Sequence, residues 1–506
     1  LVGGYLVEDI QNHGNDLNLA YNFLNGRPTS LTESLRVYTQ SDRVRYDAIY
    51  GQDQWTLGRI TLQGALRFDH AWSYSPPQTI SPTLINGQQF PSTAISFGRA
   101  DGVNYKDISP RGGFAWDVRG NGKTAVKINA GRYEDPASNL NNNYSISNPL
   151  ARIATSSSNG PVARTWNDAN GDFKPQCDFT NNLANGECGA SPQAAFGTPT
   201  FITAAIDPAL INGWGIRPND WQFGASVQQQ LAPRISVEIG YFKRWLQNFT
   251  ATDNLAVTSA DFTAFSINAP SDPRLPNGGN YSVGTLYNVV PSKFGQTSNN
   301  ITDAGNFGKQ YQSYNGFLIN FSARAASGLT LTGGINTGRT VTDNCDIRTA
   351  LPELAPTTAF CHNDPGFITK ANAIASYTIP HVDVLIAGTF RSDQGAPLQA
   401  NWNVPTATVV NPALGRTISG GAATLAVNIL EPGKVWGDRV NELDLRFAKI
   451  LHFGRMRVNA GIDVYNIINS NAILTYNQTF TPNGAWLAPT SVLSPRFMKV
   501  SAQIDF

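Results

Sequence analysis

The sequence predicts an all-β fold, a transmembrane antiparallel β-barrel, and three observations lead to this prediction. The chain ends on an aromatic residue, Phe506, at the close of an amphipathic strand. Long and short connections alternate between successive strands. The strands reach ten or more residues, whereas strands of soluble sheets have about five or six. These observations are typical of bacterial outer-membrane barrels, in which the last strand completes the ring.

The final strand lies within the last thirteen residues, SPRFMKVSAQIDF. Its alternate side chains fall on opposite faces, because a strand has a side-chain period of two. The apolar face holds Val500, Ala502, Ile504 and Phe506, and the polar face holds Lys499, Ser501, Gln503 and Asp505. A soluble sandwich can also contain such a strand, so the prediction depends on the other two observations as well.

Composition fits a barrel and excludes two other classes. Charged residues make up 14% of the chain, against about 25% in ordinary globular proteins. Mean hydropathy is −0.24 and no run approaches the ~20 apolar residues of a spanning helix, which excludes a helical membrane protein. A net charge of +1 gives no basic footprint, so we expect no nucleic-acid partner. Because Leu1 is not a start methionine, we expect a fragment or a trimmed mature piece.

Tiny turns alternate with long loops along the chain. The turns are Gly58-Arg59, Arg119–Lys123, Ala232–Arg234, Ala326–Gly328, Pro380–His381 and Phe453–Arg455. The loops are about 9–40, 75–107, 135–218, 251–308, 343–365, 396–438 and 471–493, and residues 16–40 are expected to form an extra hairpin. With residues 1–8 as a strand, about fourteen strands are expected. Because barrels place short turns in the periplasm, the loops should be extracellular and both termini periplasmic.

Within the predicted strands one face is apolar and the other is polar. Ile235, Val237 and Ile239, for example, alternate with Ser236 and Glu238. We expect the apolar faces to contact outer-membrane lipid and the polar faces to line an enclosed interior. Interior charges are expected to pair with each other across strands; they include Glu442, Asp444, Arg446 and Lys499.

Several segments, in this order, resemble TonB-dependent receptors, in particular the large Oar-like receptors of acidobacterial type. They are YGQDQWTL from Tyr50 with RITL from Arg59 and ALRFD from Ala65, SPRGGF from Ser109 with GNGKT from Gly120, DVYNIIN from Asp463, and the end from Arg496 to Phe506. The resemblance implies a 22-stranded barrel, a plug domain, and a TonB box that couples transport to the inner-membrane proton gradient. The plug motifs and the box are absent from this sequence. The chain would then be the C-terminal part of such a barrel, and its TonB complex would be reached through the missing plug.

One loop segment suggests a calcium site. Between Asn167 and Phe173, carboxamide and carboxylate oxygens alternate as in the first half of an EF-hand loop. The candidate ligands are Asp168, Asn170, Asp172 and Asp178, with Glu187 to complete the shell. The twelfth position, which should be a bidentate Glu, is Phe179. The alternative is an ordinary loop of Asx turns. No other cofactor is expected.

The four cysteines form two close pairs in the predicted external loops. We expect disulfides between Cys177 and Cys188 and between Cys345 and Cys361, because the periplasm is oxidising and CxxC spacing for zinc is absent. Each would contribute about 3 kcal/mol in the chain-entropy model. Free thiols are the alternative.

We do not expect an enzyme. Gly122-Lys123-Thr124 imitates the tail of a phosphate-binding loop, but residue 117 is Asp where the motif needs Gly. Asp69 and His70 lie near a strand end, where an omptin-like protease would place catalytic residues. Neighbours in sequence point to opposite faces of a strand, which argues against a joint role.

The leading functional hypothesis is a TonB-dependent outer-membrane receptor that takes up a scarce solute, such as a carbohydrate, a peptide or a metal chelate. Loops on a rigid scaffold carry recognition, so the best contacts are expected in loops 135–218 and 251–308. They are Trp166, Trp214, Arg274 and Tyr281. The alternatives are a passive pore or a surface adhesin without TonB coupling, and a soluble secreted binding protein.

Overall fold

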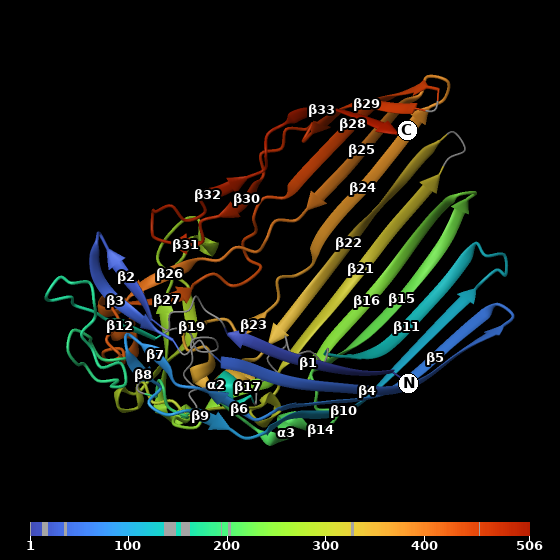
Figure 1. The fold of residues 1–506 in the computed structure, drawn as a ribbon. Helices are drawn as coiled ribbons and strands as arrows, with labels where there is room; N and C mark the ends of the chain where they lie inside the picture. Colours follow the sequence, from blue (N-terminus) through green and yellow to red (C-terminus); the bar gives the residue numbers. More distant parts are fainter. Residues whose placement is uncertain are drawn as a thin grey trace.

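One large antiparallel sheet dominates the structure (Figure 1). The computed structural model describes residues 2–12, 19–34, 38–135, 148–152, 162–193, 195–200, 204–324, 328–454 and 456–505. Within these ranges the main sheet has 16 strands, of which β14 and β23 lie off its main path. The path holds the remaining fourteen strands, the number expected from the sequence.

Successive strands of the path pair antiparallel, each with the next one along the chain, apart from strands that belong to the loops. The path is β1 (Val2–Asn12), β4 (Tyr38–Leu57), β5 (Ile60–Ser75), β10 (Ala100–Asp117), β11 (Thr124–Glu134), β15 (Asn219–Ala232), β16 (Ile235–Gln247), β21 (Tyr311–Arg324), β22 (Leu329–Asp343), β24 (Ile368–Ile379), β25 (Val384–Asp393), β28 (Val440–Phe453), β29 (Met456–Tyr465) and β33 (Phe497–Asp505). The short strands β14 (Asn212–Trp214) and β23 (His362–Asn363) pair with β10 and β22.

Short turns gather at one end of the sheet and long connections at the other, and both chain ends lie at the short-turn end (Figure 1). Gly58 has a φ of +60°, the left-handed conformation that lets the chain reverse between β4 and β5. The predicted turns Ala326–Gly328 and Phe453–Arg455 include residues outside the described part of the chain. The predicted loops were too long at three strand ends: residues 9–12 belong to β1, residues 38–40 to β4 and residues 100–107 to β10. Most of these residues are polar, but they still pair with the neighbouring strands.

In the described part of the chain, no second layer covers the row of apolar side chains at the middle of the sheet. Across four neighbouring strands, Val227, Ile239, Ile319 and Ile335 stand side by side in one row. Their side chains are 44%, 55%, 45% and 47% exposed. A continuous apolar surface of this kind requires hydrocarbon rather than water. The exposure of these side chains agrees with the predicted lipid-facing side, and an enclosed polar interior stays a prediction. None of the described helices is long and apolar enough to cross a membrane.

The path of the sheet begins at β1 and ends at β33, and no pairing joins these two strands among the described residues. The described sheet is thus a curved wall with two free edges, as Figure 1 shows. Free backbone groups at a sheet edge are costly in lipid, because no water is there to hydrogen-bond them. Closing a barrel therefore requires further pairing at both edges.

The long loops hold the two largest hydrophobic cores, and a smaller cluster lies on the sheet around Val44, Ala71, Val103 and Tyr105. A first loop body combines residues from loops 9–40, 75–107 and 135–218 around buried Leu31, Leu150 and Phe179. Its elements are β2 (Leu19–Leu24), β3 (Arg27–Glu33), β6 (Gln78–Ile80), β7 (Thr83–Ile85), β8 (Gln88–Phe90), β9 (Ile95–Phe97), α2 (Pro149–Arg152) and β12 (Val162–Thr165). The hairpin expected within residues 16–40 is confirmed as β2 and β3.

A second loop body draws on the loops 251–308, 343–365, 396–438 and 471–493 around buried Leu286, Val404 and Phe480. Its elements are η1 (Ser259–Asp261), β18 (Phe262–Asn268), η2 (Pro276–Gly278), β19 (Ser282–Val289), η3 (Pro291–Lys293), β26 (Asn401–Pro405), η6 (Thr406–Val410), α5 (Asn411–Leu414), β27 (Thr424–Asn428) and β31 (Thr479–Phe480). The remaining elements near these loops are β13 (Ala205–Ile206), α3 (Pro208–Ile211), β17 (Thr250–Asn254), β20 (Asn299–Asp303), η4 (Ala304–Asn306), α4 (Cys345–Ala350), η5 (Pro352–Leu354), β30 (Ile473–Tyr476) and β32 (Pro489–Val492).

Candidate functional site

A polar cavity of about 450 Å³ lies on the polar face of the sheet, across β4, β5, β10 and β11. We call it the wall pocket. Its polar lining residues are Tyr50, Gln52, Gln63, Arg67, Ser109, Arg111, Asn129 and Tyr133. Cavities of several hundred Å³ with convergent polar groups are the usual form of small-molecule sites.

Strand register explains why these residues meet. Gln52 lies opposite Ala65, Ala65 opposite Arg111, and Arg111 opposite Gly131. In this row two positions have little or no side chain, so the longer side chains beside them find free space. A Cβ atom added at Gly131 would lie 3.1 Å from Cγ of Arg111. Gly131 therefore leaves the room across which Arg111 extends.

Arg111 is the distinctive cation of the wall pocket. Its guanidinium carbon lies 4.4 Å from the centroid of the Tyr133 ring, a cation–π contact. No ion pair or hydrogen bond joins its side chain to another of the described residues. The guanidinium retains its five N–H donors for solvent or a solute.

The other cation of the pocket, Arg67, is already committed to protein partners. Its Nε donates to Oδ1 of Asp69 at 2.8 Å and its terminal nitrogen donates to the Tyr46 hydroxyl at 3.0 Å. The carboxylate of Asp69 is buried and also accepts from the Tyr46 hydroxyl. Arg67 thus holds Asp69 and Tyr46 in place beside the pocket, whereas the charge of Arg111 is available to the cavity.

The four residues predicted to bind ligand have different surroundings. Trp166 is 2% exposed and packs in the first loop body, where its indole N–H donates to Glu187. Arg274 binds Asp272 and backbone carbonyls, and the Tyr281 hydroxyl donates to the Ile429 carbonyl at 2.8 Å. Trp214, 61% exposed, has its ring 5.6 Å from that of Phe68. In this structure only Trp214 offers a free aromatic surface, and the other three stabilise loops.

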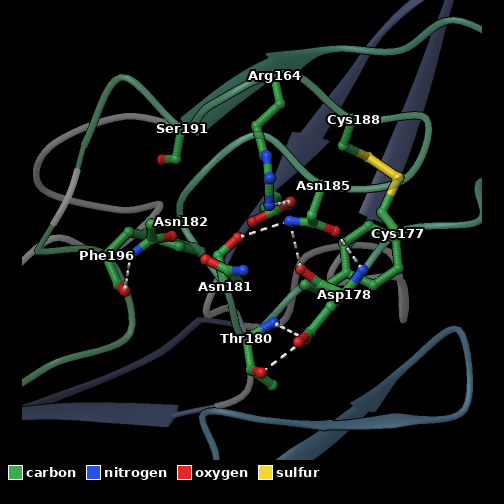
Figure 2. Close-up of polar contacts among 12 residues, drawn as sticks. Arg164, Cys177, Asp178, Thr180, Asn181, Asn182, Asn185, Cys188, Ser191 and Phe196 are labelled. Atoms are coloured by element: carbon green, nitrogen blue, oxygen red, sulfur yellow. Dashed lines mark hydrogen bonds and ion pairs between the residues drawn. A yellow bond between two sulfur atoms is a disulfide. The ribbon is translucent and has the colours of Figure 1, made fainter.

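The predicted calcium segment forms a loop of Asx turns. Asp168 accepts from the amides of Gly171 and Phe173, Asn170 from that of Asp172, and Asp172 from that of Lys174. Asp178 instead accepts from the amide and hydroxyl of Thr180, at 2.9 and 2.6 Å (Figure 2). Within the described ranges no three acidic, His or Cys side chains are placed to hold a metal ion together. Calcium binding by Asp168, Asn170, Asp172 and Asp178 stays a prediction.

Both predicted cysteine pairings are confirmed. Cys177 bonds to Cys188, with Cα atoms 5.7 Å apart, and Figure 2 shows this disulfide beside Asn185. The Asn185 amide closes the same loop, because its Nδ2 donates to three backbone carbonyls, those of Asp178, Asn181 and Leu183. The second disulfide joins Cys345 to Cys361, with a Cα separation of 4.9 Å.

Asp69 and His70 have separate partners. Asp69 binds Arg67, whereas Nε2 of His70 lies 2.7 Å from Oδ1 of Asn104. No hydrogen bond or ion pair joins the two side chains, both of which the structure describes. Each of the two side chains therefore has a partner of its own. Cross-strand ion pairs are present on the polar face, but none joins two of the four charges named in the prediction: Arg446 pairs with Asp463 and Glu442 with Arg391, each at 2.9 Å. Asp444 accepts instead from the Thr389 hydroxyl, and Lys499 has no ion pair with another of the described residues.

A family comparison agrees with this geometry of long paired strands, an exposed apolar face and a polar opposite face. Residues 7–346, more than half of the 506, match the family described as "Outer membrane beta barrel domain". The chain belongs to this family. It is therefore a β-barrel domain of the bacterial outer membrane. A search of curated proteins gives no match.

Solved outer-membrane transporters are similar to this barrel domain at low identity. The outer membrane transporter YddB from Escherichia coli is 10% identical with a TM-score of 0.42, over 92% of this chain and 54% of that one. The ferric-catecholate import receptor Fiu from E. coli is 10% identical with a TM-score of 0.42, over 96% of this chain and 53% of that one. The ferric yersiniabactin uptake receptor FyuA from Yersinia pestis is 9% identical with a TM-score of 0.41, over 95% of this chain and 48% of that one. The chain spans about half the length of these transporters.

Sequence reasoning missed Arg111 as a site residue. Its segment, Ser109 to Phe114, was singled out only for its resemblance to receptors. The sequence did place Arg111 on the polar face of β10, because side chains alternate along a strand and Arg111 shares a face with Ser109 and Gly113. The absence of a side chain opposite Arg111 depends on its pairing with Gly131, which requires the register of β10 and β11.

Proposed function

We propose that this barrel domain belongs to an outer-membrane uptake receptor in which the polar face of the sheet lines the solute path. The loop bodies would face the cell exterior, and the short turns and both termini would face the periplasm. This orientation follows the usual placement of short turns in such barrels. TonB coupling would depend on parts beyond this chain, in keeping with the sequence resemblance.

The wall pocket is the observation that supports a solute path most directly. It combines an unpaired guanidinium with the amides of Gln52, Gln63 and Asn129 and the hydroxyl of Tyr50. Amides and hydroxyls bind hydroxyl groups of a solute, and a guanidinium binds a carboxylate with two parallel hydrogen bonds. We infer a solute that carries both hydroxyl and carboxylate groups, such as a fragment of an acidic polysaccharide.

Binding tests this inference with an acidic and a neutral probe of equal length, oligogalacturonate and maltooligosaccharide. Calorimetry on the detergent-purified protein should show binding of the acidic probe alone. Arg111→Gln should weaken it about tenfold, as expected for loss of one charge-assisted hydrogen-bonded pair. Lys127→Gln is the matched control, because Lys127 is exposed on the neighbouring strand β11. Equal affinities for the two probes, or an equal loss in both variants, would contradict the assignment of the solute class.

Uptake distinguishes coupled transport from the alternatives. Cells that express the complete gene should accumulate labelled oligogalacturonate, and a proton uncoupler should abolish the accumulation. Uptake that continues after uncoupling would identify a passive pore. Surface binding without any uptake would identify an adhesin.

A further inference from the structure

On strand β16, a lysine interrupts the apolar face of the sheet. Lys243 lies in β16 between Tyr241 and Trp245, which share the face that carries Ile239. Its side chain is exposed. A cation on a lipid-facing surface is costly unless it reaches the membrane interface or an anionic partner.

The row of residues at the level of Lys243 marks the outer rim of the apolar band. Lys243 lies opposite Phe223 on one side and Asn315 on the other, and Asn315 lies opposite Arg339. On β16, the next apolar-face position beyond Lys243 is Trp245, whose ring is nearly parallel to that of Trp221 with centroids 6.4 Å apart. Tryptophan is enriched at the interface between hydrocarbon and head groups. Lys243 therefore stands at head-group depth, on the side of the sheet where the loops gather.

A groove of about 650 Å³ surrounds the lysine and is open to this surface. It is lined by Ala130, Trp221, Phe223, Lys243, Trp245, Ser313 and Asn315. Three side chains bring hydrogen-bond donors to it: the Lys243 ammonium, the Asn315 amide and the Ser313 hydroxyl. The aromatic side chains and Ala130 provide an apolar floor for the upper part of an acyl chain.

The donors of the groove have no anionic partner among the residues that the structure describes. The Lys243 ammonium contacts the Trp245 ring, 5.7 Å from its centroid, but forms no ion pair with another of the described residues. The oxygen of Asn315 accepts from the Tyr241 hydroxyl at 2.9 Å, which leaves its N–H groups to donate outward. Arg339, the other cation of the row, differs because its Nε donates to Oδ1 of Asp364 at 2.6 Å. Positive charge at this level is thus neutralised by protein at Arg339 and left free at Lys243.

We propose that this groove binds the phosphate of an outer-leaflet lipid, with Lys243, Asn315 and Ser313 around the phosphate and the two tryptophans beside the acyl chains. The lipid-facing position favours a lipid-borne phosphate over a dissolved one, because the groove is bounded by apolar surface that only an acyl chain would cover. The site is independent of the solute path, which lies on the opposite face of the sheet.

Lipid titration of the purified full-length protein, followed by native mass spectrometry, tests this proposal. The probes are lipid A with two phosphates and the same lipid after enzymatic dephosphorylation. The wild-type protein should retain the phosphorylated probe preferentially. Lys243→Gln should lower its apparent affinity about five-fold, the effect of one basic residue near an anionic surface. Lys127→Gln, which removes the same charge from the polar face, should leave it unchanged.

Four results would overturn the proposal. The first is equal affinity of wild type and Lys243→Gln for lipid A, with both proteins shown to be folded by heat-modifiable electrophoretic mobility. The second is equal retention of the phosphorylated and dephosphorylated probes. The third is displacement of lipid A by millimolar inorganic phosphate, which would identify a site for the free anion. A loss of lipid A binding in Lys127→Gln equal to that in Lys243→Gln would point to non-specific charge attraction and would also contradict the proposal.

Discussion

Removal of the Arg274 side chain should open the second loop body locally. Arg274 binds Asp272 through two nitrogens, at 2.9 and 2.7 Å, and donates to the carbonyls of Gly484 and Trp486 at 2.9 and 2.8 Å. Its guanidinium carbon also lies 5.4 Å from the centroid of the Trp486 ring. Two loops separated by about two hundred residues in sequence are thus joined by one side chain.

The magnitude follows from what Arg274→Ala leaves behind. The Asp272 side chain is 1% exposed, so its carboxylate would lose its cation without gaining water. Removal of one partner of a buried pair costs about 3–5 kcal/mol. The 30% exposure of Arg274 and the backbone amides that still donate to Asp272 reduce the expected cost to about 2–3 kcal/mol. This cost corresponds to a roughly 30- to 150-fold larger opening equilibrium.

Hydrogen exchange measures this local opening, because loops and strands need not unfold together. Amides of residues 269–281 and 477–487 should exchange faster in Arg274→Ala by that factor, while amides of β15 and β16 stay unchanged. Arg274→Lys should lie between the two, since an ammonium cannot bind Asp272 with two parallel bonds. An exchange rate in Arg274→Ala within about three-fold of wild type would refute the reasoning.

The pairing of Asp272 with Arg274 also predicts how the stability of the second loop body changes at acid pH. The Arg274 guanidinium holds the pKa of Asp272 far below its usual value. A depressed pKa stabilises the folded loop above the unfolded pKa of about 3.9, and the contribution is lost as the pH falls further. In the first loop body, burial raises the pKa of Glu33, so that group has the opposite sign and favours the folded loop at acid pH. Exchange corrected for its intrinsic pH dependence should show the first body gain stability as the pH falls toward about 4.3, the unfolded pKa of Glu, and the second body lose stability below about pH 3.9.

The remaining predictions concern three other parts of the molecule. Ile239→Lys, on the lipid-facing side, should lower the free energy of unfolding in lipid by about 2–4 kcal/mol. Ser226→Lys, on the polar face, should have little effect. A refolding titration measures both, and equal losses would contradict the assignment of the two faces. Replacement of both Cys345 and Cys361 by serine should destabilise α4 by about 3 kcal/mol, seen as faster protease cleavage near residue 350, and unchanged cleavage would show that packing alone holds this loop. Gly131→Val should displace Arg111 and reduce binding of oligogalacturonate with no change in folding, and intact binding would separate Arg111 from the site.

The strands were predictable from the sequence because each is specified locally. Period-two alternation and the turn at Gly58-Arg59 define β4 and β5 without knowledge of any other segment. Strand boundaries toward the loops were less certain, as in residues 100–107 of β10, because polar residues above the apolar band lose the alternation that identifies a strand. The disulfides were also local, since each closes a span of 11 or 16 residues.

The loop cores could not be predicted in this way. Trp166 lies in an Asn- and Gly-rich stretch that is typical of a solvent-exposed loop, yet it is buried with Leu31 and Phe90, which come from distant loops. The structural role of Arg274 was equally hard to predict, because the carbonyl groups that it binds lie more than two hundred residues later in the sequence. Contacts between loops depend on the order of strands around the sheet, and no single segment carries that information.

The shared cores have a consequence for protein engineering. A loop that buries its apolar residues against neighbours cannot be transplanted alone, because both donor and recipient would be left with half of an interface. Chimeras with another barrel should therefore exchange all of the contributing loops together. These are the loops within residues 9–40, 75–107 and 135–218 for the first body, and within residues 251–308, 343–365, 396–438 and 471–493 for the second. Sequence changes would be constrained in the same way, since they could accumulate freely only at positions that point away from these interfaces.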